Sequence, residues 1–286
     1  MPWAERLAKD IGFLGSFVKN WIRAGFRSRL ILVYPHYPSR GSTFYKIARQ
    51  LGYTLSNRPD FPFQVGMYWE YLTFREEFEM LEQVQQEKII VNLHSRDISK
   101  LHVDEQFKQV FGYSSQVNPM EYEGLIVKKN DINAKHDGHI IQGPISKEDW
   151  EEGYIYQLLI DSSEGENTVI DLRVPVVGTV CDFVYKKYVD KENRFAVRGT
   201  RVAEIYQTNE LFTQEEIELM NQFCKNMHFD FGEMDVMRHR ADGKIYIIDV
   251  NNTPQGPPKK FTKEQTRRVL TALSESFHKA FIAPQK

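Results

Sequence analysis

The spacing of apolar residues changes along the chain, from a long helical period to short alternating segments. Between residues 3 and 28, apolar side chains recur every three or four positions, which predicts an amphipathic helix. Its apolar positions are Leu7, Ile11, Leu14, Phe17, Val18, Trp21 and Ile22. Basic residues gather near its end, where cations favour a helix C-terminus. We expect this helix to dock on the body of the protein, with contact to a membrane surface or a partner as the alternative.

From residue 29 onward, short apolar runs alternate with helical patterns. The apolar run Leu30–Tyr34 ends at Pro35 and precedes a predicted helix over 42–51, which Gly52 closes. Alternation of this kind predicts a small parallel α/β sheet. Further strands are predicted over 64–69 and 88–92, with helices near 76–86 and from Asp97 or Ser99 to Phe111.

The middle of the chain is rich in strands and poor in helix until residue 213. Two capping boxes, Thr213 with Glu216 and Thr262 with Gln265, then predict the start of two helices. The strands are expected over 125–128, 139–143, 154–161, 169–177 and 181–189. We therefore divide the chain into an N-terminal helix (1–28), a small α/β lobe (29–115), a central lobe (116–160) and a C-terminal lobe (161–286).

Composition narrows the class of protein. The 286 residues include 41% apolar residues and carry a net charge of -2, so no global field attracts nucleic acid. Cys181 and Cys224 lie far apart in sequence, which argues against a disulfide scaffold and favours a reducing compartment. We find no apolar run long enough to span a membrane and no secretory signal. The expected location is the cytoplasm.

The segment Phe231–Pro254 predicts an acidic hairpin. Its turn, Ala241-Asp242-Gly243, suits a three-residue loop with a left-handed glycine. This register sets Asp235 opposite Asp249, and Glu233 opposite Asn251, with all four side chains on one face. The same alternation puts Ile245 and Ile247 on that face.

Carboxylates that face each other across a hairpin repel, and a bound cation removes the repulsion. Oxygen ligands suit a hard ion, and Mg²⁺ also takes phosphate oxygens from a nucleotide. We therefore expect Asp235, Asp249 and Asn251 to be metal ligands. The alternative is a solvated hairpin edge in which Asp249 is bonded to a lysine or arginine.

An acid on one strand, followed on the next by Asp249-Val-Asn251-Asn-Thr-Pro254, resembles the ATP-grasp superfamily, and most of all its ribosomal-protein glutamate ligase and glutathione synthetase branch. Three further motifs match in order: Asn92 ahead of Asp97-Ile-Ser-Lys100, Val127-Lys128 on a strand, and Asp171-Leu-Arg173 before Val-Val-Gly178. The resemblance covers residues 29 to 258 and implies the ATP-grasp fold, in which a small parallel α/β lobe precedes two α+β lobes that clasp ATP.

Two features depart from the family pattern. The loop from Asn130 to Gly138 has one glycine where the family often has several, so Lys135 and His136 are alternative phosphate contacts, although His136 fits an ordinary exposed turn. Asp249 stands where the family usually has glutamate, which bears on whether one or two metal ions are bound.

The resemblance implies roles for other residues. Lys100 and Lys128 would neutralise phosphate charge, with solvated surface lysines as the alternative and with the register of Lys128 and its neighbour Lys129 left open. Backbone groups of Gln157, Leu158 and Leu159 would pair with adenine, unless this is a plain buried strand. Arg173 is the expected catalytic residue, with an ion pair to Asp171 as the alternative. Arg194 and Arg198 are candidates for the substrate pocket, or belong to a solvated loop.

The implied reaction is ATP- and Mg²⁺-dependent ligation. A substrate carboxylate becomes an acyl phosphate, an amine attacks it, and ADP is formed. The alternatives are a kinase on the same scaffold that phosphorylates a hydroxyl, and a non-catalytic nucleotide-binding scaffold tied to a membrane or partner by residues 3–28. We find no nucleophile motif and no Walker sequence. The substrate is expected to be a small molecule or a peptide.

Overall fold

The computed structural model describes residues 14–15, 18, 22, 29–196 and 199–283. The chain divides into two compact units. The first contains Met1–Tyr71, Glu77–Leu93 and Thr253–Lys286, and the second contains Leu72–Glu76 and His94–Asn252. The C-terminal segment thus returns to the first unit.

Most of the helix predicted over residues 3–28 lies outside the described residues. The four residues described there, Leu14, Gly15, Val18 and Ile22, are helical. The side chains of Leu14, Val18 and Ile22 are exposed. These positions are four residues apart and so fall on one side of a helix.

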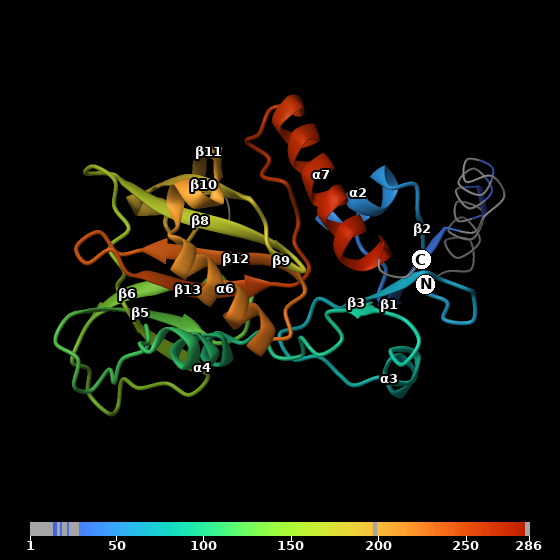
Figure 1. Cartoon of the computed structure of the whole chain (residues 1–286). Helices are drawn as coiled ribbons and strands as arrows, with labels where there is room; N and C mark the ends of the chain where they lie inside the picture. Colours follow the sequence, from blue (N-terminus) through green and yellow to red (C-terminus); the bar gives the residue numbers. More distant parts are fainter. Residues whose placement is uncertain (1–13, 16–17, 19–21, 23–28, 197–198, 284–286) are drawn as a thin grey trace. The chain divides into compact units, whose positions relative to one another are not determined.

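The first unit is built on a parallel sheet, as predicted. The strand order is β2-β1-β3-β4, and every pair is parallel (Figure 1). The strands are β1 (Leu30–Pro35), β2 (Thr54–Ser56), β3 (Val65–Trp69) and β4 (Ile90–Val91). Its helices are α2 (Thr43–Gln50), α3 (Glu79–Val84) and α7 (Lys263–Phe277), which continues as the π-helical turn η2 (His278–Ile282).

Helices cover both faces of this sheet. Successive strand residues point to opposite sides, so each strand has buried side chains on both faces. On one face, Phe44 of α2 stacks on Trp69 and also contacts Phe277 of α7. On the other face, Tyr68 meets Phe78, just before α3. Helices α2 and α7 pack against each other although they are far apart in sequence.

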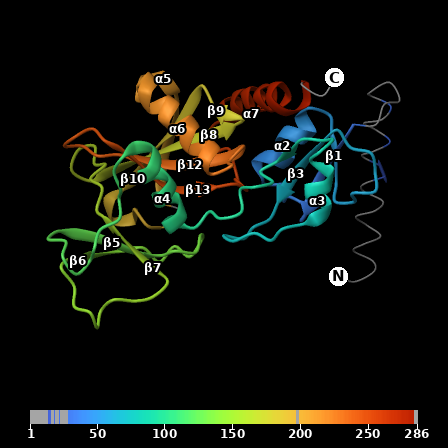
Figure 2. The same ribbon diagram turned by 60° about the horizontal axis from the view of Figure 1, so that its bottom comes forward.

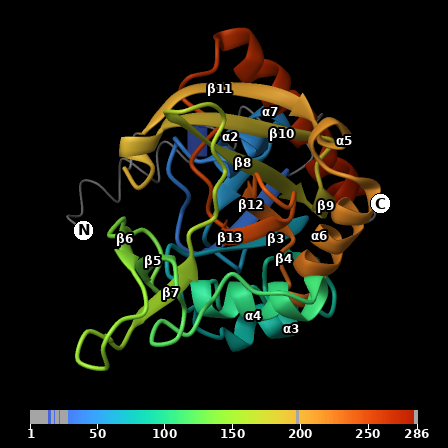
Figure 3. The same cartoon turned by 90° about the vertical axis from the view of Figure 1, so that its left-hand side faces the viewer.

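The second unit contains two antiparallel sheets (Figure 3). The larger has the order β11-β10-β8-β12-β13, with β9 paired to β8. The smaller has the order β6-β5-β7. The larger sheet consists of β8 (Thr168–Val177), β9 (Thr179–Val180), β10 (Phe183–Asp190), β11 (Thr200–Gln207), β12 (Phe231–Arg238) and β13 (Ile245–Asn251). The smaller consists of β5 (Leu125–Asn130), β6 (His139–Gln142) and β7 (Tyr154–Leu158).

Two helices, α4 (Lys100–Phe111) and α6 (Gln214–Asn226), lie side by side against the larger sheet (Figure 2). Their apolar faces and the sheet form one core that includes Phe107, Phe223 and Met234. The predicted caps are present, because Ser99 and Thr213 accept hydrogen bonds at the helix starts and Gly112 ends α4 in a left-handed conformation. A 3-10 turn, η1 (Lys191–Asn193), and a short helix, α5 (Thr208–Leu211), complete the unit.

Across the described ranges, we find no helix with both the length and the apolar character needed to cross a membrane.

Candidate functional site

The predicted hairpin forms, and the facing pairs predicted for the acids are present, although the pairs next to the turn are shifted by one residue. In β12 and β13, Asp235 lies directly opposite Asp249, and Glu233 lies opposite Asn251. Gly243 in the turn has a φ of 72°, the left-handed conformation that the loop requires. Because residues that pair directly share one face of a sheet, the four polar side chains gather on the same side.

Charged residues of β8 and β10 extend this polar face. Arg173 of β8 pairs in register with Asp235, and Tyr185 of β10 pairs with Arg173. Lys187 of β10 pairs with Asp171 of β8. The polar side chains therefore form a continuous charged face across four strands. We call this the charged face; it comprises Asp171, Arg173, Lys187, Glu233, Asp235, Asp249 and Asn251.

A β-bulge changes one detail of the predicted pattern. The register shifts between Asp235 and Val236, so that Val236 pairs with Ile247 while Asp235 pairs with Asp249. Val236 follows Asp235 directly and points to the opposite face, and Ile247 goes with it into the core. Ile245 pairs with Arg238 and is also buried in this core. The prediction that Ile245 and Ile247 share the face of the carboxylates is therefore wrong.

A close approach of two backbones supports the hairpin beside the charged face. A Cβ atom added to Gly232 of β12 would lie 2.3 Å from the carbonyl oxygen of Asn251. Only glycine allows the strand to pass the Asn251 backbone at this distance.

Arg173 makes a two-point contact with Asp235. Its Nε donates to Oδ1 at 2.8 Å, and its Nη2 donates to Oδ2 at 3.0 Å. Its Nη1 also lies 3.4 Å from Oε2 of the buried Glu233. The charge of Asp235 raises the pKa of Arg173 above its ordinary value. The ion pair between Arg173 and Asp171 that the sequence left open is replaced by these two partners.

Lys187 lies between Asp171 and Asp235. Its Nζ lies 3.5 Å from Oδ2 of Asp171 and 3.8 Å from Oδ1 of Asp235. Burial raises the pKa of Asp235, but Arg173 and Lys187 outweigh burial and hold that pKa well below its usual range. Asp235 is thus a stable anion that already has two cationic partners.

Asp249 differs from Asp235 in its partners. Its Oδ1 atom is buried and accepts no hydrogen bond from any described residue. Burial raises the pKa of Asp249, with the repulsion of Asp235 in the same direction and the attraction of Lys100 against it. A buried oxygen without a partner costs free energy, and a bound cation would remove that cost. The donor set and the orphaned oxygen therefore fit a hard metal ion.

Lys129 of β5 is the lysine of the smaller sheet that faces these acids. Its Nζ donates to the carbonyl oxygen of Ile248 in β13 at 3.3 Å. Burial lowers its pKa to about 8, and the charges of Asp249 and Asp235 partly oppose that shift. The sequence could not choose between two adjacent lysines, because neighbouring strand residues point to opposite faces.

Lys128 lies on the other face of the smaller sheet. Its Nζ forms an ion pair with Glu151, and it lies 5.0 Å from the ring centroid of Tyr154. The phosphate role that the resemblance assigns to Lys128 stays a prediction. Of the two lysines, Lys129 is the one that reaches β13, whereas Lys128 pairs with Glu151.

Lys100, at the start of α4, is held by the loop between β5 and β6. Its Nζ donates to the carbonyl oxygens of Asp131 and Ile132 at 3.4 and 3.1 Å, and to Oδ1 of Asn133 at 3.0 Å. Burial lowers the pKa of Lys100, while the charge of Asp249 raises it. Lys100 thus lies within the electrostatic influence of the charged face. In the same loop, Lys135 and His136 are exposed.

The predicted adenine-binding stretch lies on a largely buried strand, and its backbone N–H groups at Leu158 and Leu159 form hydrogen bonds within the unit. The Leu158 N–H donates to the Ser115 carbonyl at 2.8 Å, and the Leu159 N–H donates to the Leu125 carbonyl at 2.9 Å. The Gln157 side chain is also buried and donates to Oγ of Ser115 at 2.8 Å. The hinge role of these residues stays a prediction, and these two amides already have partners within the unit.

Arg194 lies in the segment between β10 and β11, where it is partly buried. Its Nη2 donates to the carbonyl oxygen of Ile160 at 3.3 Å, and its Nε is buried without a hydrogen-bond partner among the described residues. Burial lowers the pKa of Arg194. Arg198 lies outside the described residues. The substrate role proposed for both arginines stays a prediction.

Among the described residues, the charged face does not form a complete cation site by itself. In the part of the chain that the structure describes, no three His, Cys, Asp or Glu side chains gather as a cation site. An ion at Asp235 and Asp249 would therefore need the Asn251 oxygen and oxygens from a ligand.

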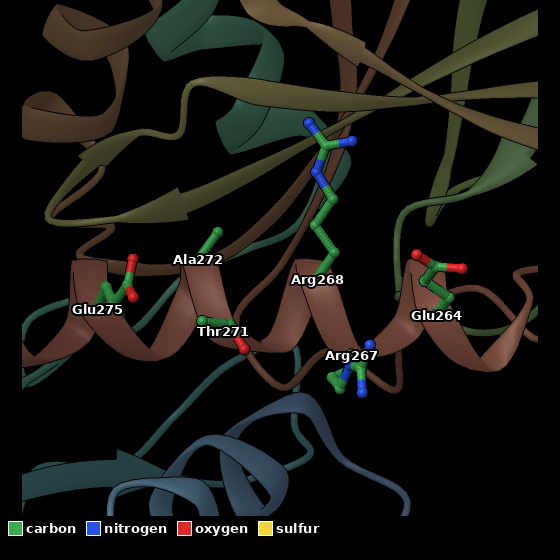
Figure 4. Close-up of a pocket in the computed structure, with 6 residues that line it drawn as sticks. All are labelled: Glu264, Arg267, Arg268, Thr271, Ala272 and Glu275. Atoms are coloured by element: carbon green, nitrogen blue, oxygen red, sulfur yellow. The ribbon is translucent and has the colours of Figure 1, made fainter.

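An open depression lies along α7, lined by Glu264, Arg267, Arg268, Thr271, Ala272 and Glu275 (Figure 4). All six residues come from one helix, which cannot enclose a ligand alone.

Comparison with solved structures identifies the fold. No protein-family model matches the chain, and no curated protein matches it. D-alanine–D-alanine ligase from Bacillus anthracis in complex with ATP is similar, with 11% identity, 91% of this chain and 98% of that chain covered, and a TM-score of 0.55. The ATP-grasp ligase PsnB in complex with a minimal precursor gives 13% identity, coverage of 87% and 99%, and a TM-score of 0.51. The chain has the ATP-grasp fold, as the sequence motifs indicate.

Proposed function

We propose that the chain is an ATP- and Mg²⁺-dependent ligase that activates a substrate carboxylate for attack by an amine. The observation that carries this proposal is the charged face, where Asp235 and Asp249 meet and Oδ1 of Asp249 has no partner among the described residues. Facing carboxylates with one orphaned oxygen suit a cation that arrives with its own ligands.

Mg²⁺ is usually held by one or two carboxylates together with phosphate oxygens, rather than by a cage made of protein alone. Asp235, Asp249 and the Asn251 amide would supply the protein oxygens. When bound, the ion would neutralise phosphate charge. Asp249 is the principal ligand in this account, because Arg173 and Lys187 already compensate Asp235.

The cations around the charged face have separate tasks. Lys129 is placed to neutralise nucleotide phosphates, and Lys100 can join it when its bonds to the 131–133 loop are exchanged for phosphate oxygens. Arg173 is held in a fixed orientation by Asp235 and Glu233, so its remaining surface can stabilise charge on a transferring phosphoryl group. The protein would thus catalyse by positioning and charge neutralisation.

The reaction class follows the fold neighbours. Both of the neighbours named above are ligases, and one of them is described with ATP and the other with a precursor. An acyl phosphate formed from the substrate carboxylate and the γ-phosphoryl group would be attacked by an amine, giving an amide, ADP and phosphate. A peptide is the acceptor or donor that we would test first, alongside amino acids.

The test is a screen for ADP and free phosphate with pooled amino acids and peptides, using the full chain with Mg²⁺ and ATP. A ligase should release both products only when a carboxylate and an amine are both present. ADP with a phosphorylated product and no free phosphate would show a kinase instead. ATP binding without turnover in any pool would contradict the enzymatic proposal.

A further inference from the structure

A buried chain of hydrogen bonds joins α4 to the strand that carries Gln157. Asp104 of α4 is 3% exposed. Its Oδ1 accepts the Ser115 N–H at 2.8 Å and the Ser115 hydroxyl at 2.6 Å, and its Oδ2 accepts the Ser114 hydroxyl. Oγ of Ser115 in turn accepts from Nε2 of Gln157 at 2.8 Å. We call Asp104, Ser115 and Gln157 the relay.

The direction of every bond in the relay is fixed by chemistry. An ionised carboxylate can only accept hydrogen bonds, so the Ser115 hydroxyl must donate its single proton to Asp104. The hydroxyl oxygen is then left as an acceptor toward Gln157. The Gln157 carboxamide must therefore turn its NH₂ group to Ser115, and its carbonyl oxygen lies at the opposite end of the amide.

Gln157 lies on the face of the smaller sheet that turns toward the charged face. It pairs in register with Val127, and Lys129 follows two residues later on the same side. Lys129 is the residue that reaches β13 and the acids. The fixed carboxamide oxygen therefore belongs to the same face as the lysine that we assign to the phosphates.

We propose that Asp104 and Ser115 are positioning residues that hold the Gln157 carboxamide oxygen toward the nucleotide base and so select adenine over guanine. Adenine offers an amino group at its sixth position, which donates, whereas guanine carries an oxygen there, which accepts. A fixed acceptor bonds the first and repels the second. This inference rests on the proposed function, since it concerns the nucleotide of that site.

The experiment measures dissociation constants of MgATP and MgGTP for the full chain by titration calorimetry. Ser115→Ala removes the acceptor that holds the NH₂ group, so the amide can flip. We expect the preference for ATP to fall about tenfold, which corresponds to one well-placed hydrogen bond. Asp104→Asn should reduce the preference further, because an asparagine NH₂ can donate to Ser115 and reverse the whole relay.

The matched control is Ser114→Ala. Ser114 bonds to the same carboxylate but does not touch Gln157, so its loss should leave the ATP-to-GTP ratio unchanged. In a Gln157→Ala background, Ser115→Ala should have no further effect on the ratio, because the relay acts through Gln157. Melting curves identify variants that fail to fold, and Ser115→Ala remains informative if Asp104→Asn does not fold.

The outcomes separate the two proposals. Wild-type chain that binds neither nucleotide would contradict the proposed function, and the inference with it. Wild-type chain that binds both nucleotides equally would overturn the inference alone. So would folded Ser115→Ala with an unchanged ratio, or Ser114→Ala with a ratio that falls as far as that of Ser115→Ala.

Discussion

Asp235 and Asp249 face each other directly across the hairpin of β12 and β13, yet Arg173 makes a two-point contact with Asp235 alone. Asp235 and Asp249 therefore have different partners. Asp235 fixes the guanidinium on the neighbouring strand, whereas Asp249 keeps a buried oxygen that no described residue satisfies. This asymmetry is the physical basis for placing nucleotide-borne Mg²⁺ at Asp249.

Loss of Arg173 should affect stability as well as turnover. Arg173→Ala leaves Asp235 with Lys187 as its remaining ion-pair partner and takes the guanidinium away from the buried Glu233. Breaking a largely buried ion pair from one side costs about 3 kcal/mol. Urea unfolding should show this loss, and a turnover assay should show no activity. Arg201→Ala is the control, because its pair with Asp190 is exposed and should contribute less than about 1 kcal/mol.

Substitution of the two adjacent lysines tests the register of β5. Lys129→Met should weaken MgATP binding by about tenfold or more, since it removes a charge beside the phosphates. Lys128→Met should leave the affinity nearly unchanged, because Lys128 pairs with Glu151 on the other face. Titration of both variants with MgATP gives the comparison. Equal losses in the two variants would contradict the assignment of Lys129.

The low pKa of Lys129 predicts a pH dependence of nucleotide binding. Burial lowers that pKa to about 8, and adjacent phosphate would keep the ammonium charged in the complex. Binding above pH 8 then requires uptake of a proton, so the dissociation constant of MgATP should rise with pH and approach tenfold per pH unit. Lys129→Arg, which stays charged, should flatten this dependence. A wild-type profile that is flat from pH 7.5 to about 9.5 would contradict the account.

The same group has a stability signature of definite sign. Between pH 8 and 10.5 the unfolded chain holds more protons at Lys129 than the folded chain does, since the ordinary pKa is 10.5. This group therefore makes the free energy of unfolding increase with pH in that window. The increase should be absent in Lys129→Met when both proteins are followed by urea unfolding.

Local patterns were enough to predict the hairpin and its facing pairs, Asp235 with Asp249 and Glu233 with Asn251. The Ala241-Asp242-Gly243 turn marks where the chain reverses, but the His239 N–H donates to the Lys244 carbonyl, so the loop spans 240–243. The bulge after Asp235 then restores the predicted facing pairs. The capping boxes at Thr213 and Thr262 likewise begin helices where predicted. The turn and the helix caps depend on residues close in sequence, so the sequence alone determines them.

Other features depend on partners that are distant in sequence. The bulge after Asp235 could not be read from strict alternation, and it places Ile245 and Ile247 in the core. The contact of Arg173 with Asp235 joins residues 62 positions apart, so the sequence offers only the nearby Asp171 as an alternative ion-pair partner. Strand β11 was missed because Arg201, Glu204 and Gln207 give it the polar composition of a loop.

The most direct test of the Asp249 site is the effect of MgATP on the melting temperature of Asp249→Asn compared with the wild type. The substitution preserves shape and removes the charge that would hold the ion. We expect Mg²⁺-dependent protection by ATP in the wild type and in the exposed control Asp182→Asn, and none in Asp249→Asn. Protection of Asp249→Asn equal to that of the wild type would contradict the metal site and the function built on it.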